Sequence, residues 1–254
     1  MRDSERRIIS SKKDLSTILP TLRKGDVITG IIPLREGEEH ILLDLIERDI
    51  TVIPSATSQL ASRSKTFQAR ILKPWMLQET TVIYNRHQLL EATTLFHRNA
   101  IERVIVKHDR KNGGIGIFLY NNIEDVYNQS GCTSMRYPFV IQPFLPNSRD
   151  IRVIILDKYQ EAYSRENPDS FRNNLHCGGV AQPYALTTEM QNLCREVMER
   201  ARFPYAHLDL MLSENETLFL AEINLRGGIR GAKISTTEYK SRIKDIEENL
   251  LRQL

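Results

Sequence analysis

Short apolar runs alternate along this chain with stretches in which apolar residues recur at helical spacing. Near the N-terminus, apolar runs at 27–34 and 50–54 flank the segment 36–48, which has such a helical pattern. A strand, a helix and a second strand in this order form a βαβ unit, with parallel strands and a right-handed crossover. We therefore predict one βαβ unit here, preceded by a polar helical segment at 14–19 that ends at Pro20. Its first turn lacks a Gly-rich fingerprint, so dinucleotide binding is not expected.

The central part of the chain also contains both apolar runs and stretches with helical spacing. The pattern is helical from 55 to 91, apart from a break at Lys73-Pro74 and a short strand at 80–84. Prolines in the apolar strand at 138–145 favour an edge or linker position, because proline cannot donate to a strand ladder. The remaining predicted elements are a helix at 85–98, strands at 103–107 and 117–120, a helix at 188–200 and a charged helix from about 238 to 254.

The segment 206–224 has the pattern of a hairpin around a candidate site. Two apolar runs flank the polar cluster 213–216, which is a turn signal. If the turn has four residues, Leu212 pairs with Thr217, and side chains then alternate between the two faces of each strand. This register places on one face Asp209, Leu220, Glu222 and Asn224, and on the core face Leu208, Leu210, Leu212, Phe219, Ala221 and Ile223.

Two carboxylates and a carboxamide therefore meet among apolar neighbours, at Asp209, Glu222 and Asn224. Carboxylates in a partly buried site repel each other and lose hydration unless a cation neutralises them. Magnesium, a hard cation that prefers oxygen ligands and often holds substrate phosphates, would neutralise them. The alternative is a surface hairpin whose polar face meets water, since such alternation is common in antiparallel sheets.

A second hairpin, 150–165, suggests an anion site. With a turn at 157–160, Arg152 lies opposite Arg165, and like charges directly opposed destabilise a sheet. A phosphate or carboxylate beside them would resolve the conflict, and Arg172 in the following loop adds another cation.

Two lysines could meet phosphates. Lys107 ends an apolar strand and is followed by the Gly-rich loop 109–116, whose backbone amides could approach phosphate oxygens. The spacing is not that of a P-loop, so a flexible turn is the alternative. Lys65, taken alone, is a solvated lysine of a helix.

Composition narrows the classes of function. The chain has 254 residues, a net charge of +3 and 41% hydrophobic residues, which is typical of a globular protein of one large or two modest domains. Without a dense Lys/Arg stripe, no nucleic-acid partner is predicted, and the basic residues are expected to meet a small anionic ligand. No apolar run is long enough to cross a bilayer, and residues 1–13 lack the apolar core of a signal peptide. We expect a cytoplasmic protein with no membrane partner.

The cysteines are Cys132, Cys177 and Cys194, and their uneven spacing favours free thiols over disulfides or a zinc site. The neighbouring His176 and Cys177 could suggest nucleophilic chemistry. No third orienting group is visible, so we favour a structural histidine.

Four motifs occur in the order, and at roughly the spacing, of a known family. They are Asp150-Ile-Arg152, Phe171-Arg-Asn-Asn174-Leu-His-Cys-Gly-Gly179, Leu208-Asp209-Leu210 and Glu222-Ile-Asn224. On these motifs, the chain from about Arg63 to its C-terminus resembles RimK-type ATP-grasp proteins, the ribosomal-protein glutamate ligases and their relatives. The resemblance implies an α+β (α/β) fold, the ATP-grasp fold, in which two α+β subdomains grip ATP. It implies a truncated Rossmann-like βαβ domain at 1–62 and an ATP-grasp domain at 63–254. The latter would divide into a nucleotide-covering subdomain at about 80–142 and a metal- and acceptor-binding subdomain at 143–254.

The resemblance also implies roles for single residues. It assigns Lys65 and Lys107 to ATP phosphates; Gln142, Phe144 and Leu145 to adenine; Asp150 to the ribose side; Asp209, Glu222 and Asn224 to Mg²⁺, with Mn²⁺ as the alternative; and Arg152, Arg172 and Asn174 to the transferring phosphoryl group and the acyl phosphate. Arg226 and Arg230, which follow the last motif, suggest an anionic acceptor.

The implied activity is that of an ATP-dependent carboxylate-amine ligase. In this family ATP phosphorylates a carboxylate, and an amine then displaces phosphate from the acyl phosphate. The expected substrates are small-molecule or peptide carboxylates and amines, and a homo-oligomer is compatible with the sequence. The alternatives are an ATP-grasp kinase that phosphorylates a small-molecule hydroxyl and a non-catalytic ATP-binding module. Three departures distinguish this chain: Pro143 replaces an acidic residue of the adenine connector, Leu225-Arg226 replaces a small residue and proline, and the N-terminal domain is short.

Overall fold

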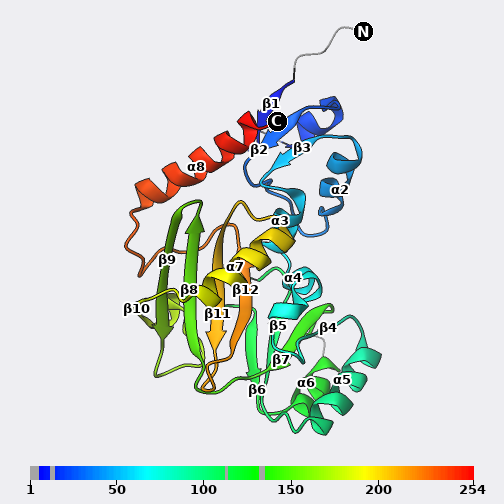
Figure 1. The fold of residues 1–254 in the computed structure, drawn as a ribbon. Coiled ribbons are helices and arrows are strands. Elements are labelled where there is room, and N and C mark those ends of the chain that lie inside the picture. The colour runs from blue at the N-terminus through cyan, green and yellow to red at the C-terminus, as the bar shows by residue number, and fades with distance from the viewer. Residues whose placement is uncertain (1–5, 12–14, 112–113, 132–134) are drawn as a thin grey trace.

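The computed structural model describes residues 6–11, 15–111, 114–131 and 135–254. Asp14, Asn112, Gly113 and Cys132, which belong to features predicted above, lie outside the described residues. The described residues form three sheets, each beside its own hydrophobic core (Figure 1). One sheet is parallel and lies near the N-terminus, and the other two are antiparallel. The fold is therefore α+β, as predicted.

The N-terminal sheet has the order β1-β2-β3, and all its pairs are parallel. The predicted βαβ unit is confirmed, because α2 connects β2 to the parallel β3. The polar start of the chain contains a strand that was not predicted, since Ile9 alone is buried in it between exposed neighbours. The elements are β1 (Ile8–Ser10), α1 (Leu15–Ile18), η1 (Leu19–Thr21), β2 (Val27–Thr29), α2 (His40–Glu47) and β3 (Thr51–Ile53).

Two short helices connect this sheet to the next one, where a longer helical pattern was predicted. The helical pattern is interrupted at Ser62–Ser64, and the Ser64 side chain accepts a hydrogen bond from the Phe67 amide, as an N-cap does. The cap makes Lys65 the first residue of its helix and buries it, so Lys65 is not a solvated helix lysine. The elements are α3 (Ala56–Ala61), α4 (Lys65–Ile71) and η2 (Lys73–Trp75).

The smaller antiparallel sheet has the order β4-β7-β5-β6, with two helices on one side (Figure 1). The prediction that 138–145 lies at an edge or in a linker was wrong, because β7 is an interior strand. Its prolines lie just before the strand and at its last position, so Phe139, Val140 and Ile141 can pair on both sides. The elements are β4 (Thr81–Ile83), α5 (Arg86–Arg98), β5 (Val104–His108), β6 (Ile117–Tyr120), α6 (Ile123–Ser130) and β7 (Phe139–Pro143).

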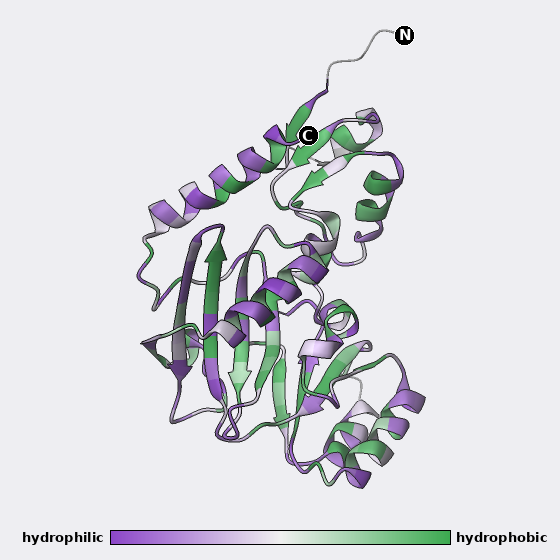
Figure 2. Ribbon diagram, viewed as in Figure 1, coloured by the Kyte–Doolittle hydropathy of each residue, from purple (hydrophilic) through white to green (hydrophobic). Residues whose placement is uncertain are grey.

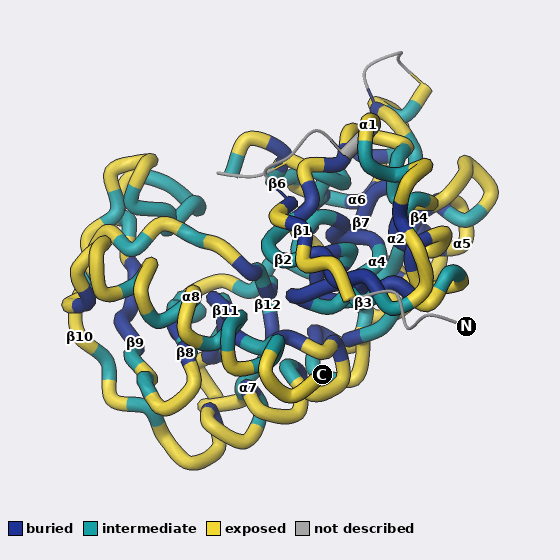
Figure 3. Tube along the Cα trace, turned by 90° about the horizontal axis from the view of Figure 1, so that it is seen from above, coloured by how far each residue is buried: buried dark blue, intermediate teal, exposed yellow. Residues whose placement is uncertain are grey.

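The larger antiparallel sheet has the order β10-β9-β8-β11-β12. Helix α7 packs against the core of this sheet through Met190, Cys194 and Val197. Its outward surface is largely hydrophilic, whereas the strands of the sheet are largely hydrophobic (Figure 2). Strand β10 is the exposed outer edge (Figure 3). The elements are β8 (Arg149–Leu156), β9 (Tyr159–Glu166), η3 (Leu175–Cys177), β10 (Val180–Tyr184), α7 (Thr188–Ala201), β11 (Tyr205–Leu212), β12 (Leu218–Asn224) and α8 (Thr236–Arg252).

Two further features of the described part concern its cysteines and the length of its helices. Cys177 and Cys194 are both free, the first exposed and the second buried, and burial raises the pKa of the Cys194 thiol to about 12. Among the described residues, no helix combines the length and the apolar character needed to span a bilayer.

The register of the hairpin β8-β9 corrects a prediction. Leu156 pairs with Tyr159, so the turn contains only Asp157 and Lys158, and Asp157 adopts a left-handed φ of 56°. The shorter turn moves β9 by two residues relative to the predicted register. Arg152 consequently lies opposite Tyr163 and not opposite Arg165. The argument from opposed arginines therefore does not hold.

The register of the hairpin β11-β12 also differs from the prediction. Leu212 pairs with Leu218, and a bulge between Asp209 and Leu210 shifts the pairing further, so that Asp209 lies opposite Glu222. Leu220 was predicted on the polar face, but it pairs with Leu210 in the core and is 1% exposed. The predicted gathering of Asp209, Glu222 and Asn224 on one face is nevertheless present, because the bulge compensates for the altered turn.

Candidate active site

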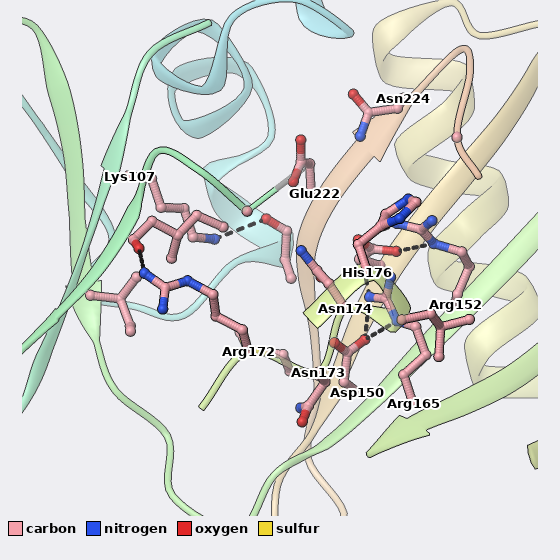
Figure 4. A pocket seen from close by; sticks show the side chains of 18 of the residues that line it. Lys107, Asp150, Arg152, Arg165, Arg172, Asn173, Asn174, His176, Glu222 and Asn224 are labelled. Carbon is pink, nitrogen blue, oxygen red and sulfur yellow. Dashed lines mark hydrogen bonds and ion pairs between the residues drawn. The ribbon is translucent and has the colours of Figure 1, made fainter. Parts of the chain in front are cut away.

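A cavity of about 500 Å³ lies between the two antiparallel sheets. Its walls come from β5, from the connector between β7 and β8, from β8, β9, β11 and β12, and from loops at 171–176 and 226–230. Figure 4 shows charged side chains entering it from both sheets, with Lys107 and Arg172 on one side and Arg152 and Arg165 on the other. The size is that of an ordinary small-ligand pocket.

A row of four side chains crosses the large sheet on the face toward this cavity. The strand registers place Tyr163 of β9 beside Arg152 of β8, Arg152 beside Asp209 of β11, and Asp209 beside Glu222 of β12. Because opposite residues of neighbouring strands point to the same face, the row is a direct result of the two corrected registers. All four side chains line the cavity.

Two arginines hold the Asp209 carboxylate. Arg152 donates from Nε to Oδ1 at 2.7 Å and from Nη2 to Oδ2 at 2.8 Å, and Arg165 Nη2 lies 3.1 Å from Oδ2. Burial disfavours the charged carboxylate, but Arg152 and Arg165 outweigh it and keep the pKa of Asp209 well below its usual range. A bidentate contact of this kind is a strong one. Asp209 is therefore ionised and largely neutralised.

Asp150 shares one of these arginines. It lies opposite Arg165, whose Nη2 is 2.5 Å from Asp150 Oδ1, and Arg165 is only 4% exposed. Burial raises the pKa of Asp150 to about 6, with Asp209 adding to the rise and Arg165 opposing it. Asp150, Arg165, Asp209 and Arg152 thus form one continuous buried charge network.

Lysines from outside the large sheet meet its last strand. Lys65 Nζ lies 3.2 Å from Glu222 Oε1 and donates to the carbonyl of Lys111 at 2.6 Å, and Lys107 Nζ donates to the carbonyl of Ala221 at 3.2 Å. Burial lowers the pKa of Lys107 to about 8, although Glu222 partly opposes the shift. The two predicted phosphate lysines are therefore brought together at Glu222.

The connector after β7 forms another wall of the cavity. Gln142, Phe144 and Leu145 line it, and Gln142 is buried. The Phe144 amide donates to the Arg103 carbonyl at 2.8 Å, and the Arg103 guanidinium stacks over the Phe144 ring at 4.4 Å. The connector thus offers an ordered aromatic wall, even though Pro143 provides no acidic side chain.

The loop 171–176 reaches from the large sheet to the small one. Arg172 Nη2 donates to the Ile117 carbonyl at 2.5 Å. Gly114 has a φ of +81° and lies so close to Asn174 that a Cβ atom there would be 2.6 Å from Asn174 Nδ2. Arg172, Asn174 and Gly114 all line the cavity, so the described end of the Gly-rich loop meets the loop 171–176 there.

The segment 226–230 closes the cavity on the side of α8. Arg226 and Arg230 are exposed and line it, and no carboxylate of the described residues forms an ion pair with either. Gly227 packs against the buried ring of His207, where a Cβ atom would fall 2.7 Å from Nδ1. His207 Nε2 is 2.8 Å from the Tyr239 hydroxyl, and burial lowers the pKa of His207 to about 4, so the ring is neutral.

The predicted metal ligands offer a suitable set of oxygens. The described residues contain no group of three His, Cys, Asp or Glu residues placed to hold a metal ion. The carboxylates of Asp209 and Glu222 and the Asn224 carboxamide do share one face, however. After the ion pairs are formed, one oxygen of Glu222 and one lone pair of Asp209 remain available to bind a cation. The set fits magnesium that takes its other ligands from water and from ligand phosphates.

Two residues were not singled out in the sequence: Tyr163, which lines the cavity, and His207, which packs behind Gly227. Arg165 was predicted at an anion site beside Arg152, but its place opposite Asp150 was missed, because the turn was counted as four residues instead of two. Tyr163 lies in the mostly polar strand β9, and His207 lies in the largely apolar strand β11. Such residues require hydrogen-bond partners when buried, and this was the available signal.

Comparisons with known proteins agree on the family of this chain. A model of the RimK-like ATP-grasp domain matches residues 64–247. The glutathione synthetase of Agrobacterium fabrum is 29% identical over 147 residues, which cover 52% of this chain and 44% of that protein. A probable alpha-L-glutamate ligase of Shewanella amazonensis is 33% identical over 92 residues, 35% of this chain and 30% of that protein. The chain thus matches less than half of the length of these relatives.

The fold recurs among solved structures. The crystal structure of the D-cycloserine synthetase DcsG matches with a TM-score of 0.64 over 88% of this chain and 84% of that one, at 13% identity. At this identity the likeness concerns the fold alone.

Proposed function

Because the chain belongs to the RimK-like ATP-grasp family, we propose that it is an ATP-dependent carboxylate-amine ligase that forms an acyl phosphate. The observation that carries the proposal is the charge of the cavity. Among the described residues, eight Lys or Arg side chains line it against three carboxylates. Such an excess of positive charge around one cavity favours an anionic ligand, and a nucleoside triphosphate with a carboxylate substrate would supply it.

Several chain residues would bind and orient the nucleotide. We assign Lys65 and Lys107 to its phosphates, because both ammonium groups lie at the strand that carries Glu222. The wall formed by Gln142, Phe144 and Leu145 suits a planar base, and Asp150 lies at the start of β8 next to this connector, toward the ribose side.

Asp209, Glu222 and Asn224 would hold magnesium, with manganese as the alternative. The bound ion would neutralise phosphate oxygens and fix their orientation for transfer. In the free protein, Arg152, Arg165 and Lys65 compensate the same carboxylates.

Arg152, Arg172 and Asn174 would face the transferring phosphoryl group and the acyl phosphate. Their role is to stabilise charge and to position the reacting groups, which is the main contribution a protein makes to such a transfer. No protein nucleophile is required, and none is assigned. Arg226 and Arg230 have no carboxylate partner in the described residues, so we assign them to the carboxylate of an amino-acid or peptide substrate.

The activity can be tested with magnesium, ATP and a panel of amino acids and short peptides. We expect ADP release only when a carboxylate donor and an amine acceptor are both present, and hydroxylamine in place of the amine should yield a hydroxamate. Glu222→Gln should abolish both signals, whereas Glu214→Gln, in the exposed turn of the same hairpin, should leave them unchanged. ADP release that needs a hydroxyl compound and gives no hydroxamate would indicate a kinase instead. Nucleotide binding without turnover would indicate a binding module.

Lys107 gives the nucleotide site a pH signature. Its pKa in the folded chain is lowered to about 8. Lys107 therefore contributes to the free energy of unfolding above pH 10.5, where it is neutral, and this contribution is lost as the pH falls through 8. A bound polyphosphate should restore the ammonium form. At pH 8, MgADP binding should therefore take up roughly half a proton, measured by calorimetry in buffers with different ionisation enthalpies. Lys107→Met should remove this uptake, whereas Lys73→Met, an exposed control, should keep it.

A further inference from the structure

Tyr163 is the least exposed aromatic residue in the wall of the cavity, and its hydroxyl lacks a partner. The residue is 1% exposed and lines the cavity, yet no hydrogen-bond partner of its Oη is present among the described residues. A buried hydroxyl without a partner destabilises the folded chain, because it loses its hydrogen bonds to water and gains none in return. Such a group in a native fold requires an explanation, and a ligand at a functional site is one.

The surroundings of Tyr163 consist of donors. Arg152 lies opposite it on β8 and approaches the hydroxyl as a donor, and both Arg152 and Arg165, two residues further along β9, act on it electrostatically. Asp209, the carboxylate that acts on the hydroxyl electrostatically, accepts from the same two arginines. No acceptor among the described residues lies within hydrogen-bonding distance of the hydroxyl.

The ring itself is held firmly in place. Gly231 has a φ of +90°, and a Cβ atom there would lie 3.4 Å from Tyr163 Cε2 and 2.5 Å from the Cβ atom of Ala181. The segment after Gly228 thus packs closely on the ring and prevents it from turning away. Burial raises the pKa of Tyr163, so the hydroxyl keeps its proton and acts as a donor.

An oxygen anion bound by Arg152 would lie beside this donor, because Arg152 and Tyr163 are directly opposed in the sheet. We propose that the Tyr163 hydroxyl is a catalytic residue that donates a hydrogen bond to an oxygen of the phosphoryl group held at Arg152, in the ligand and in the acyl phosphate. The inference rests on the proposed function. It adds a neutral donor, fixed before the ligand arrives, to a site otherwise built from charged groups.

Tyr163→Phe tests the inference, because it removes only the hydroxyl. Without the hydroxyl, the ligand-free protein should have an unchanged or higher Tm, since the buried hydroxyl proton has no acceptor in the folded chain. The affinity for inorganic phosphate in the presence of saturating MgADP, measured by calorimetry, should fall about tenfold or more. The affinity for MgADP alone should stay unchanged.

Tyr205→Phe is the matched control. Its side chain is also buried, but its hydroxyl donates to Glu247 of α8 at 2.6 Å and does not line the cavity. This variant should lower the Tm and leave phosphate binding unchanged.

Three results would overturn the inference. A Tm of Tyr163→Phe that falls as in Tyr205→Phe would show that the hydroxyl is satisfied within the folded chain. Phosphate affinity equal in the natural chain and in Tyr163→Phe, or no phosphate binding to the natural MgADP complex, would show that the hydroxyl contacts no phosphoryl oxygen. Failure of the natural chain to bind MgADP at all would instead overturn the proposed function, and this inference with it.

Discussion

Replacing Arg165 with methionine should lower the free energy of unfolding by about 3–5 kcal/mol near pH 8, the largest stability effect we expect from one substitution. Arg165 is 4% exposed and lies 2.5 Å from Asp150 and 3.1 Å from Asp209. Methionine would fill much of the space but leave two buried carboxylates with Arg152 alone. Chemical denaturation at several pH values measures the effect.

The loss should be smaller at low pH. The pKa of Asp150 in the natural folded chain is already raised to about 6, so folding favours its protonated form. The stability that this protonation contributes is fully present below pH 3.8 and is lost as the pH rises through 6. Without Arg165 the pKa should rise further, which extends this window upward. We therefore expect Arg165→Met to be closer to the natural chain at pH 5 than at pH 8.

Two further variants make this expectation specific. Asp150→Asn added to Arg165→Met should recover part of the stability, because it removes one of the unpaired charges. Arg149→Met removes an exposed arginine that pairs with Glu216 and should change stability little. Equal losses at pH 5 and pH 8 would contradict the electrostatic explanation and indicate a packing defect.

The second large effect concerns nucleotide binding. Magnesium and ATP at roughly 100 times the dissociation constant should stabilise the natural chain by about 2.7 kcal/mol, a Tm shift of about 5–10 °C for a protein of this size. The double variant Asp209→Asn, Glu222→Gln should lose this shift, because both carboxylates of the proposed metal site are removed while the side-chain sizes are kept. Differential scanning calorimetry with and without the ligand measures it.

The shift upon ligand addition is the relevant quantity, not the Tm itself. Asp209→Asn leaves Arg152 and Arg165 with less compensating charge, so the ligand-free double variant should already melt earlier. Glu214→Gln lies in the turn of the same hairpin and should keep the full shift. A double variant that retains the shift would mean that the nucleotide and its metal are held elsewhere, and the ligase proposal would then have to be withdrawn.

The order of the elements and the candidate residues could be predicted because both depend on local features of the chain. Asn85 and Thr187 cap helices α5 and α7 where helical patterns begin, and the alternation at 206–224 marks a hairpin whatever its register. The four motifs identified the family, and the family model now matches residues 64–247. The predicted phosphate, base and metal residues all line one cavity.

What the sequence by itself determined is therefore the type of most helices and strands, though not of β1, α6 and β10, and which polar residues face a common site. Only the tertiary structure decided how the strands are aligned and ordered. The two-residue turn at Asp157 places Arg165 opposite Asp150. Together with the bulge after Asp209, it brings Tyr163, Arg152, Asp209 and Glu222 into one row. The physical reason is that periodicity specifies the face of a residue, whereas its partner depends on turn geometry and on packing between distant segments.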